Sequence, residues 1–319
     1  MSKLYLNDLE KKIKDLKEIS ELLGTDLSEE ISIIKEKIQR AKEENEETDS
    51  WERVKTARHM ERPRTKEYIE IITDSFIELH GDRRFSDDKS IIGGIGKIEN
   101  IPVTIIGHQK GRSTEENIER NFGMPNPEGY RKALRLMKQA EKFNRPIINF
   151  IDTPGAYCGL GAEERGQAQA IAENLLEMSR LKVPTISIVI GEGGSGGALA
   201  LGVADKIAML ENSIYSVISP EGLASILWKD AKNAPKAAEV MKLTAENLLE
   251  LEVIDDIINE PLGGAHESKE DMAENIKAYI LKSLDELSNF NHMTVEKRYE
   301  KIRNMGKYSR IDEKKNDED

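Results

Sequence analysis

The sequence predicts an α/β protein built from repeated strand–helix turns around a sheet that is covered on both faces. Three segments carry this prediction, and in each a proline enters a run of β-branched and apolar residues that ends in a glycine-bearing turn. They read NIPVTIIGHQKG from Asn100, NRPIINFIDTPGA from Asn144 and LKVPTISIVIGEGG from Leu181. Because the runs are almost wholly apolar, they are typical of strands buried on both faces. Their loose repetition favours a core of stacked turns.

Two heptad-like apolar series open the chain and predict a helical hairpin over residues 1–48. Asp26 and Glu29, between the two series, form a D-x-x-E pair that is typical of a helix start. An arm packed on the main domain and an oligomer contact both fit this pattern, and they are compatible. The apolar positions are Leu9, Ile13, Leu16 and Leu23 in the first series, and Leu27, Ile31, Ile34, Ile38 and Ala41 in the second.

The main domain is expected to span residues 51–296. It opens on the basic stretch WERVKTARHMERPRT and continues as a predicted helix through YIEIITDSFIELH. Amphipathic sequences at 127–143 and 163–181 predict the helices that lead into the second and third strands. From Lys297 the chain is charged and poor in apolar residues, so residues 297–319 are expected to form a disordered tail.

Composition excludes several classes of protein. No run of about 18 apolar residues is present, and the charged N-terminus lacks the apolar core of a secretion signal, so no membrane association is expected. The lone cysteine, Cys158, excludes an internal disulfide and a cysteine-rich zinc site, and it favours a cytoplasmic protein without a metal. A net charge of −12 argues against nucleic acid as the main partner.

The segment GEGGSGGALALG at 191–202 places five glycines in seven positions after an expected strand end at Ile190. Gly191, Gly193 and Gly196 match the dinucleotide pattern G-x-G-x-x-G, and Glu211 stands where a ribose-binding acid is expected. In a segment this rich in glycine the match is weak. A phosphate-binding P-loop is excluded, because Ala198 and Leu199 replace the required lysine and hydroxyl residue.

The same segment contains G-x-S-x-G, the pattern of a nucleophile elbow. Asp255 and His266 follow Ser195 in the chain order of an α/β-hydrolase triad. An elbow serine sits directly at the strand end, whereas Ser195 lies well past Ile190, and His266 falls in a polar stretch. We therefore disfavour this alternative.

An oxyanion site is a further alternative, because glycine lets backbone N–H groups approach a ligand and a helix N-terminus adds positive charge. Such a site uses no catalytic side chain and stabilises a developing carbonyl or enolate oxygen. A second exposed-backbone turn, TPGAYCGLG at 153–161, follows the neighbouring strand, so two turns side by side can donate to one oxygen. Glycines required for tight packing look identical in sequence, and this alternative stays open.

Several long motifs then identify a resemblance. IIGHQKGR, RNFGMPNPEGYRKALRLM, FIDTPGAY, GAEERGQ, GEGGSGGALALG, YSVISPEG and EPLGGAH occur in this order between residues 105 and 266. Over about 51–292 the chain closely resembles the α subunits of bacterial acetyl-CoA carboxylase carboxyltransferase. It departs from the family at Cys158, where proline is expected.

The resemblance implies a crotonase-like spiral of ββα turns and a defined reaction. The carboxyl group passes from carboxybiotin, attached to a biotin carboxyl carrier protein, to acetyl-CoA, and malonyl-CoA is formed for fatty acid biosynthesis. ATP is used by the separate biotin carboxylase. A zinc-ribbon-bearing β subunit completes the site in an α2β2 assembly. The ureido oxygen of biotin and the enolate oxygen of acetyl-CoA each need an oxyanion site, and biotin itself can take the proton.

The resemblance also implies the residues of the site. Backbone N–H groups of the 193–197 segment are expected to bind the biotin oxygen, Gly196 and Gly197 ahead of Gly193 and Gly194. Gly155 and Ala156 come next. Weaker candidates for the CoA phosphates or a carboxylate are Lys110, Arg112 and Arg131. His108 is interpreted as a packed or capping residue rather than a catalytic one, and Ser219 as an N-cap before Pro220.

Two other functions stay open at this stage. One is another biotin-dependent acyl-CoA carboxyltransferase or another crotonase-fold acyl-CoA enzyme such as a hydratase. A hydratase needs paired acidic side chains directed into the site, and no such arrangement is established for Asp152, Glu163, Glu164 or Glu192. The other is a scaffold that only binds a β subunit.

Overall fold

The computed structural model describes residues 50–288 and 294–306. The predicted hairpin at 1–48 lies outside the described residues. Within them, eight strands form one sheet in the order β1-β2-β3-β4-β5-β6-β8, with β7 paired to the end of β5. The strands are β1 (Ser75–Glu78), β2 (Ile91–Ile98), β3 (Ile101–His108), β4 (Ile147–Thr153), β5 (Thr185–Gly194), β6 (Lys206–Leu210), β7 (Ile214–Ser216) and β8 (Asp256–Ile258).

The three predicted strands are β3, β4 and β5, and they lie side by side in the centre of the sheet. β3 pairs with β4 and β4 with β5 in parallel, whereas β1, β2 and β3 are joined antiparallel. The parallel arrangement brings the carboxyl ends of β4 and β5 to the same edge of the sheet. This edge carries both glycine-bearing turns.

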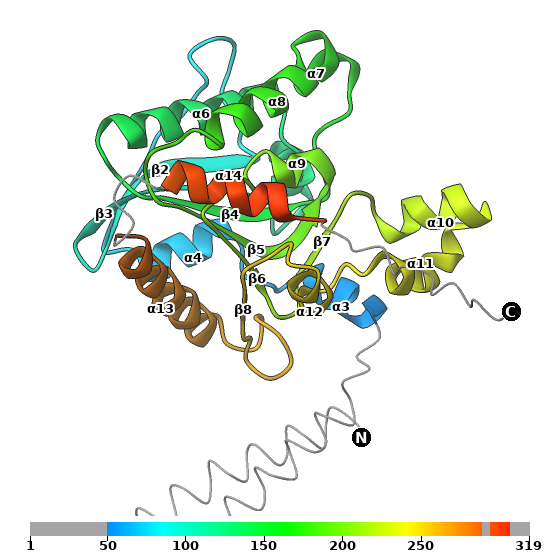
Figure 1. The fold of residues 1–319 in the computed structure, drawn as a ribbon. Coiled ribbons are helices and arrows are strands. Elements are labelled where there is room, and N and C mark those ends of the chain that lie inside the picture. The colour runs from blue at the N-terminus through cyan, green and yellow to red at the C-terminus, as the bar shows by residue number, and fades with distance from the viewer. Residues whose placement is uncertain (1–49, 289–293, 307–319) are drawn as a thin grey trace, which may run out of the picture.

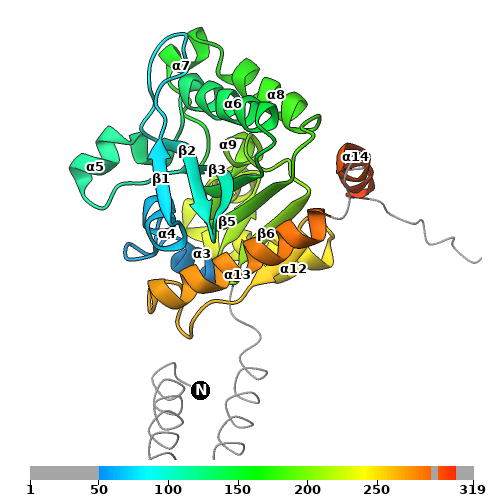
Figure 2. The same cartoon turned by 90° about the vertical axis from the view of Figure 1, so that its left-hand side faces the viewer.

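Helices cover both faces of the sheet (Figures 1 and 2). On one face lie α6 (Pro127–Lys142) and α8 (Gln167–Met178), and on the other lie α4 (Thr65–Ile72) and α13 (Lys269–Ser288). Successive residues of β4 serve opposite faces, since Ile148 packs with the α4 and α13 side and Ile147 with the α6 side. The near-continuous apolar runs of the sequence are therefore explained by burial on both faces.

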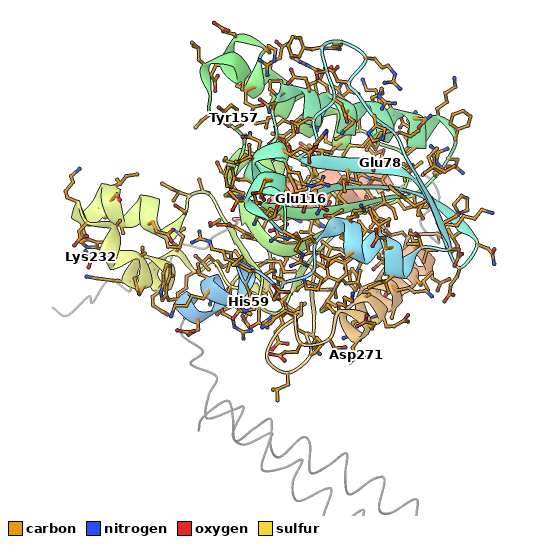
Figure 3. The ribbon with its side chains drawn as sticks, turned by 180° about the vertical axis from the view of Figure 1, so that it is seen from behind. His59, Glu78, Glu116, Tyr157, Lys232 and Asp271 are labelled. Atoms are coloured by element: carbon orange, nitrogen blue, oxygen red, sulfur yellow. The ribbon has the colours of Figure 1, made fainter. Side chains whose placement is uncertain are left out.

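Shorter helices connect these layers or extend beyond them. α10, η2 and α11 form a projection at one side of the molecule, with Lys232 far out on it (Figure 3). The remaining helices are α3 (Ser50–Ala57), α5 (Thr114–Glu119), η1 (Asn121–Gly123), α7 (Leu160–Glu164), α9 (Ser195–Leu199), α10 (Pro220–Trp228), η2 (Ala231–Asn233), α11 (Ala234–Met241), α12 (Ala245–Glu250) and α14 (Thr294–Asn304).

Three segments differ from expectation. Residues 75–78 form the edge strand β1 instead of continuing the preceding helix. The helix expected over 163–181 is divided into α7 and α8 at Gly166, whose φ of +83° is left-handed. α14 covers 294–304, where the disordered tail was expected to begin. Its Arg298 is 1% exposed and pairs with Asp205. Residues 307–319 lie outside the described residues.

Candidate functional site

The glycine-rich segment is the end of a strand and the start of a helix, and not a loop as expected. β5 continues past Ile190 through Gly194, with every residue buried, and α9 begins at Ser195. The extension exists because Gly193 pairs with Thr153 of β4 on one side and with Tyr215 of β7 on the other.

Packing requires glycine at several positions of the β5–α9 junction, but it does not require glycine at position 196. A Cβ on Gly194 would lie 2.1 Å from the Pro154 carbonyl oxygen, and one on Gly197 would lie 2.5 Å from the Ala156 nitrogen. A Cβ on Gly193 would lie 2.9 Å from the Tyr215 ring. At Gly196 it would reach only Ile171, at 3.8 Å, which is an ordinary contact. Packing therefore does not explain the absence of a side chain at Gly196.

The turn after β4 lies directly against this helix start. Gly155 has a φ of +149°, and its N–H donates to the Thr153 hydroxyl at 3.1 Å. Gln167 at the start of α8 donates from Nε2 to the Tyr157 carbonyl at 2.7 Å and to the Pro125 carbonyl at 2.8 Å. The two predicted turns are therefore neighbours, but only the 154–158 segment is a turn, since 191–194 is a buried strand end; Gln167 holds the 154–158 turn in place.

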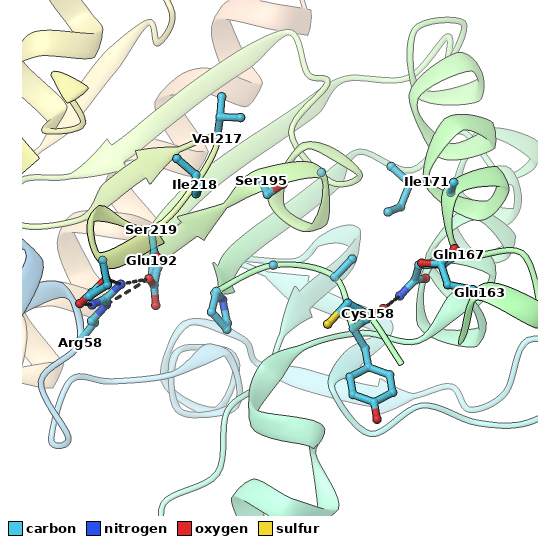
Figure 4. A pocket seen from close by; sticks show the side chains of 17 residues that line it. Arg58, Cys158, Glu163, Gln167, Ile171, Glu192, Ser195, Val217, Ile218 and Ser219 are labelled. Carbon is cyan, nitrogen blue, oxygen red and sulfur yellow. Dashed lines mark hydrogen bonds and ion pairs between the residues drawn. The ribbon is translucent and has the colours of Figure 1, made fainter. Parts of the chain in front are cut away.

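A pocket of about 700 Å³ opens between the turn and the helix start (Figure 4). Its walls come from the 154–158 turn, the first turns of α8, the β5–α9 junction and the loop that enters α10. The lining residues are Arg58, Pro154, Gly155, Ala156, Tyr157, Cys158, Glu163, Gln167, Ala168, Ile171, Glu192, Ser195, Gly196, Val217, Ile218, Ser219 and Glu221.

Of the predicted site residues, Gly155, Ala156 and Gly196 line this pocket. Gly193, Gly194 and Gly197 do not line it and lie behind its wall. Ser219 lines it as well, and its hydroxyl accepts from the Gly222 N–H at 3.1 Å, which is the expected N-cap.

The three basic candidates do not line the pocket, and each pairs with a carboxylate of this chain. Lys110 Nζ lies 2.6 Å from Asp152, Arg112 pairs with Glu67, and Arg131 lies 3.4 Å from Glu128. The partners of Lys110 and Arg112 are distant in sequence, so a sequence pattern does not reveal these two pairs, whereas Glu128 precedes Arg131 by one turn of α6.

Sequence reasoning missed the charged wall of the pocket. Arg58 reaches Glu192 at 2.6 Å and Glu221 at 2.7 Å, and all three side chains line the pocket (Figure 4). Burial lowers the pKa of Arg58, but hydrogen bonds and charge from the two carboxylates outweigh it, and the pKa is raised. Two features of the sequence could have revealed this charged wall: the basic stretch at 51–65, and Glu192, an acidic residue between two glycines.

His108 is the last residue of β3 and is completely buried. Burial lowers its pKa to about 4, so the imidazole is neutral at physiological pH. Neither ring nitrogen makes a well-aligned hydrogen bond. The interpretation of His108 as a packed residue fits this environment.

The structure does not assemble the hydrolase triad. The distance argument against Ser195 is wrong, because β5 ends at Gly194 and Ser195 follows it with a left-handed φ of +53°. However, Asp255 is paired with Lys301 at 2.6 Å, and His266 stacks on His59 at 3.9 Å between ring centroids. No histidine lines the pocket among the described residues.

The dinucleotide alternative also fails. A Cβ on Gly191 would lie 2.6 Å from an Asp152 carboxylate oxygen, so this glycine is covered by a side chain and is not open to a pyrophosphate. Over residues 50–288 and 294–306, no group of three His, Cys, Asp or Glu side chains is placed to hold a metal ion. The helices in these ranges are also too short or too polar to span a membrane.

Comparison with known proteins gives closely similar relatives. A family model described as acetyl co-enzyme A carboxylase carboxyltransferase-like matches residues 3–306. The chain is 59% identical to the acetyl-coenzyme A carboxylase carboxyl transferase subunit alpha of Alkaliphilus oremlandii, over 96% of this chain and 97% of that protein. It is 64% identical to the subunit of the same name from Clostridium perfringens, over 81% and 95%.

Solved structures of distant sequence share the fold. A transcarboxylase 12S structure with methylmalonyl-coenzyme A bound matches with a TM-score of 0.57 at 18% identity, over 73% of this chain and 44% of that longer chain. The Pseudomonas malonate decarboxylase MdcD–MdcE heterodimer matches with a TM-score of 0.56 at 15% identity, over 69% and 88%. The crotonase-like α/β fold is confirmed by these neighbours.

Proposed function

The chain belongs to the family of acetyl-CoA carboxylase carboxyltransferase α subunits, and we propose that its pocket binds the ureido oxygen of biotin through backbone N–H groups at the start of α9. The activity of the family is transfer of a carboxyl group from carboxybiotin to acetyl-CoA, which forms malonyl-CoA for fatty acid biosynthesis. The β subunit that completes the enzyme, the α2β2 assembly and the biotin carboxyl carrier protein that delivers carboxybiotin belong to this proposal.

Gly196 is the observation that carries the proposal. It lines the pocket and has no packing neighbour that would exclude a side chain, unlike Gly194 and Gly197. A glycine at such a position leaves room for a ligand that approaches the backbone closely. The first N–H groups of any helix lack an intrahelical acceptor, so Gly196 and Gly197 at the start of α9 have donors for an anionic oxygen.

The short length of α9 changes the expected electrostatics. A helix of five residues has a small macrodipole, well below the half charge of a long helix. The stabilisation must therefore come from the individual N–H groups. Removing one such donor typically costs about 3 kcal/mol of transition-state stabilisation.

Carboxybiotin, when bound, supplies the carboxyl group and an oxygen that becomes negative as that group leaves. This chain would hold that oxygen at Gly196, with Gly155 and Ala156 forming the opposite wall, whereas Gly197 does not line the pocket and would act through its packing against Ala156. Gly193 and Gly194 would act behind the wall through packing. Glu192 and Glu221 of the pocket are both engaged by Arg58, and the scheme needs no general base from the protein because biotin itself can take the proton.

Substrate contact by Lys110, Arg112 and Arg131 stays a prediction. Each would have to exchange a carboxylate of this chain for one on the ligand or for a CoA phosphate. Asp152 is 7% exposed and Glu128 is 3% exposed, so the exchange is less favourable for Lys110 and Arg131 than for Arg112, whose partner Glu67 is half-buried.

The test uses Gly196→Ala in the complex with a cognate β subunit. The new methyl group would enter the pocket without disturbing packing and would hold the ligand away from the N–H groups, so we expect an unchanged melting temperature and a loss of turnover of about 100-fold. The assay is malonyl-CoA-dependent carboxylation of biocytin, with each subunit alone as a control. Gly161→Ala is the matched control, because a Cβ there meets only the flexible end of Arg165 at 3.0 Å.

Unchanged turnover in Gly196→Ala would contradict the proposed site. Activity from this chain alone would contradict the need for a β subunit. An assembled but inactive wild-type mixture would favour a different acyl-CoA substrate or a scaffold function.

A further inference from the structure

The hydrogen-bond ladder between β4 and β5 breaks next to Pro154 and Glu192, which line the pocket. Ile151 pairs with Val189, but the next pair is Thr153 with Gly193, so residues 190–192 of β5 face Asp152 alone. A break of this kind redirects the strand end and leaves backbone N–H groups without a ladder partner. It is this redirection that carries Gly194 against Pro154.

The side chain of Asp152 fills the break. Its Oδ1 accepts the Glu192 N–H at 3.0 Å and thereby replaces a missing ladder hydrogen bond. Glycine at position 191 leaves room for this carboxylate, since a Cβ there would lie 2.6 Å from the same oxygen. The presence of glycine at 191 is thus explained by the carboxylate of the neighbouring strand.

Lys110, which follows β3, neutralises this carboxylate. Its Nζ lies 2.6 Å from Asp152 Oδ1 and 3.6 Å from Glu192 Oε2, and its side chain is 16% exposed. Its stem lies under Gly123, where a Cβ would come within 2.6 Å of Lys110 Cγ. Burial raises the pKa of Asp152, but the charge and hydrogen bond of Lys110 outweigh it and hold the pKa below its usual value.

We propose that Asp152 and Lys110 are positioning residues for the pocket: they hold the ends of β4 and β5 in the arrangement that seats Gly194 and Gly197 against the 154–156 turn. The inference rests on the proposed function of Gly196. Neither side chain lines the pocket, so both act through the backbone that they fix. A displacement of about 1 Å at a reacting centre costs about 100-fold in rate, which makes this fixation consequential.

The experiment compares Asp152→Asn with wild type in the assembled complex with the β subunit. Asparagine keeps the shape and an oxygen for Glu192 N–H but leaves Lys110 with only the more distant Glu192 carboxylate, at 3.6 Å, as a counter-charge. Per assembled complex we expect kcat for biocytin carboxylation to fall about 10- to 100-fold. The KM for malonyl-CoA should change less than about twofold, because the lost interaction supports the transition state and not ground-state binding of the CoA ester.

A second variant tests whether the two residues act as a unit. Lys110→Met should lower kcat by a similar factor, and the double variant Lys110→Met/Asp152→Asn should fall no further than either single variant. Should Asp152→Asn fail to assemble, Lys110→Met reports on the same pair.

Asp205→Asn is the matched control at the opposite end of β5. Asp205 Oδ2 accepts the Thr185 N–H at 2.8 Å and pairs with Arg298 at 2.7 Å, so its chemistry repeats that of Asp152 away from the pocket. We expect this variant to lower the melting temperature and to keep wild-type kcat per assembled complex.

The outcomes separate the two proposals. Wild-type kcat in Asp152→Asn, with turnover lost in Gly196→Ala, would overturn the positioning role and leave the pocket proposal intact. Unchanged turnover in Gly196→Ala would overturn both. Equal losses of kcat in Asp152→Asn and Asp205→Asn would reveal a general effect of instability and would also overturn the positioning role.

Discussion

At the residue scale, three glycines of the β5–α9 junction differ in what surrounds them. A methyl group on Gly194 or Gly197 would overlap the backbone of the 154–156 turn, whereas one on Gly196 would not. We therefore expect Gly194→Ala to lower the free energy of unfolding by about 1–3 kcal/mol, as other overpacked substitutions do. Thermal melting of Gly194→Ala and Gly196→Ala measures the contrast, and equal melting temperatures would contradict it.

His108 gives the protein a predicted pH dependence of stability. Its pKa is lowered by burial to about 4 in the folded state, against an ordinary value of 6.5. Above pH 6.5 the imidazole is neutral in both states, so no effect arises there. As the pH falls from 6.5 towards 4, the unfolded chain binds the proton first, and we expect a loss of about 3 kcal/mol of stability from this residue.

Denaturant unfolding at several pH values between 7.5 and 4 tests this effect. His108→Gln should be less stable at neutral pH but should lose less stability on acidification than wild type over that window. Asp152 lies near the imidazole and should keep its charge above pH 4, because its pKa is lowered. Parallel pH curves for wild type and His108→Gln would show that the imidazole is not the source.

The sequence predicted residue types better than residue roles. Lys110 was predicted to contact a ligand, but it pairs with the carboxylate of Asp152. That residue lies 42 positions away in sequence, at a strand end that only the fold brings near. Gly196 could not be distinguished from Gly197 for a similar reason. What separates the two is the position of the 154–156 turn, and this is a tertiary property.

At the element scale, strands and helices with strong apolar periodicity were predicted well. β3, β4, β5 and α6 lie where the apolar runs and the amphipathic pattern place them. Two misses have local causes. β5 runs past Ile190 because Thr153 of β4 and the strand β7 pair with its last residues, although the glycines there have little strand propensity of their own. α7 and α8 separate at Gly166, where the left-handed φ interrupts an otherwise helical pattern.

α14 was missed because a buried charge stabilises it. Arg298 is fully buried and donates to the Met178 carbonyl at 2.7 Å and the Leu181 carbonyl at 2.8 Å, in addition to its pair with Asp205. A charged sequence with few apolar residues does not predict such an anchor, since the residues that bind Arg298 lie about a hundred positions earlier in the chain.

Removing this anchor should destabilise the fold without affecting the pocket. Arg298→Ala leaves the Asp205 carboxylate buried and unpaired, which typically costs about 3–5 kcal/mol. We expect a lower melting temperature and unchanged kcat per assembled complex. Glu300→Ala, on the exposed side of α14, serves as the control and should melt like wild type. A normal melting temperature in Arg298→Ala would show that α14 is not anchored by this pair.

At the scale of the whole molecule, the pocket has the surroundings of an interface. Val217 lines its mouth and is 83% exposed, and Leu160 of the nearby α7 is 77% exposed. A family in which an α subunit works with a β subunit explains large exposed apolar side chains at the rim of the pocket. The fold itself was predictable from repeated apolar runs, whereas this exposed rim depends on how the loops before α7 and α10 are placed.

Val217→Asp should weaken assembly with the β subunit while leaving the assembled site intact. A carboxylate at the centre of an apolar contact loses its water on assembly without gaining a partner, so the complex becomes less stable. We expect low biocytin carboxylation at limiting β subunit and recovery of activity when the β subunit is in excess. Gly196→Ala should not recover under the same titration, because its defect lies in the site and not in assembly.

Ile77→Asp provides the control for this last prediction. Ile77 is 67% exposed on the edge strand β1, at the opposite edge of the sheet from β8 and away from the pocket-lining residues, so its charge should not alter the titration. Sedimentation of the mixtures would report assembly independently of turnover. If Val217→Asp gave the same activity curve and the same complex as wild type, the rim would not be the contact surface, and the exposed apolar side chains there would need another partner.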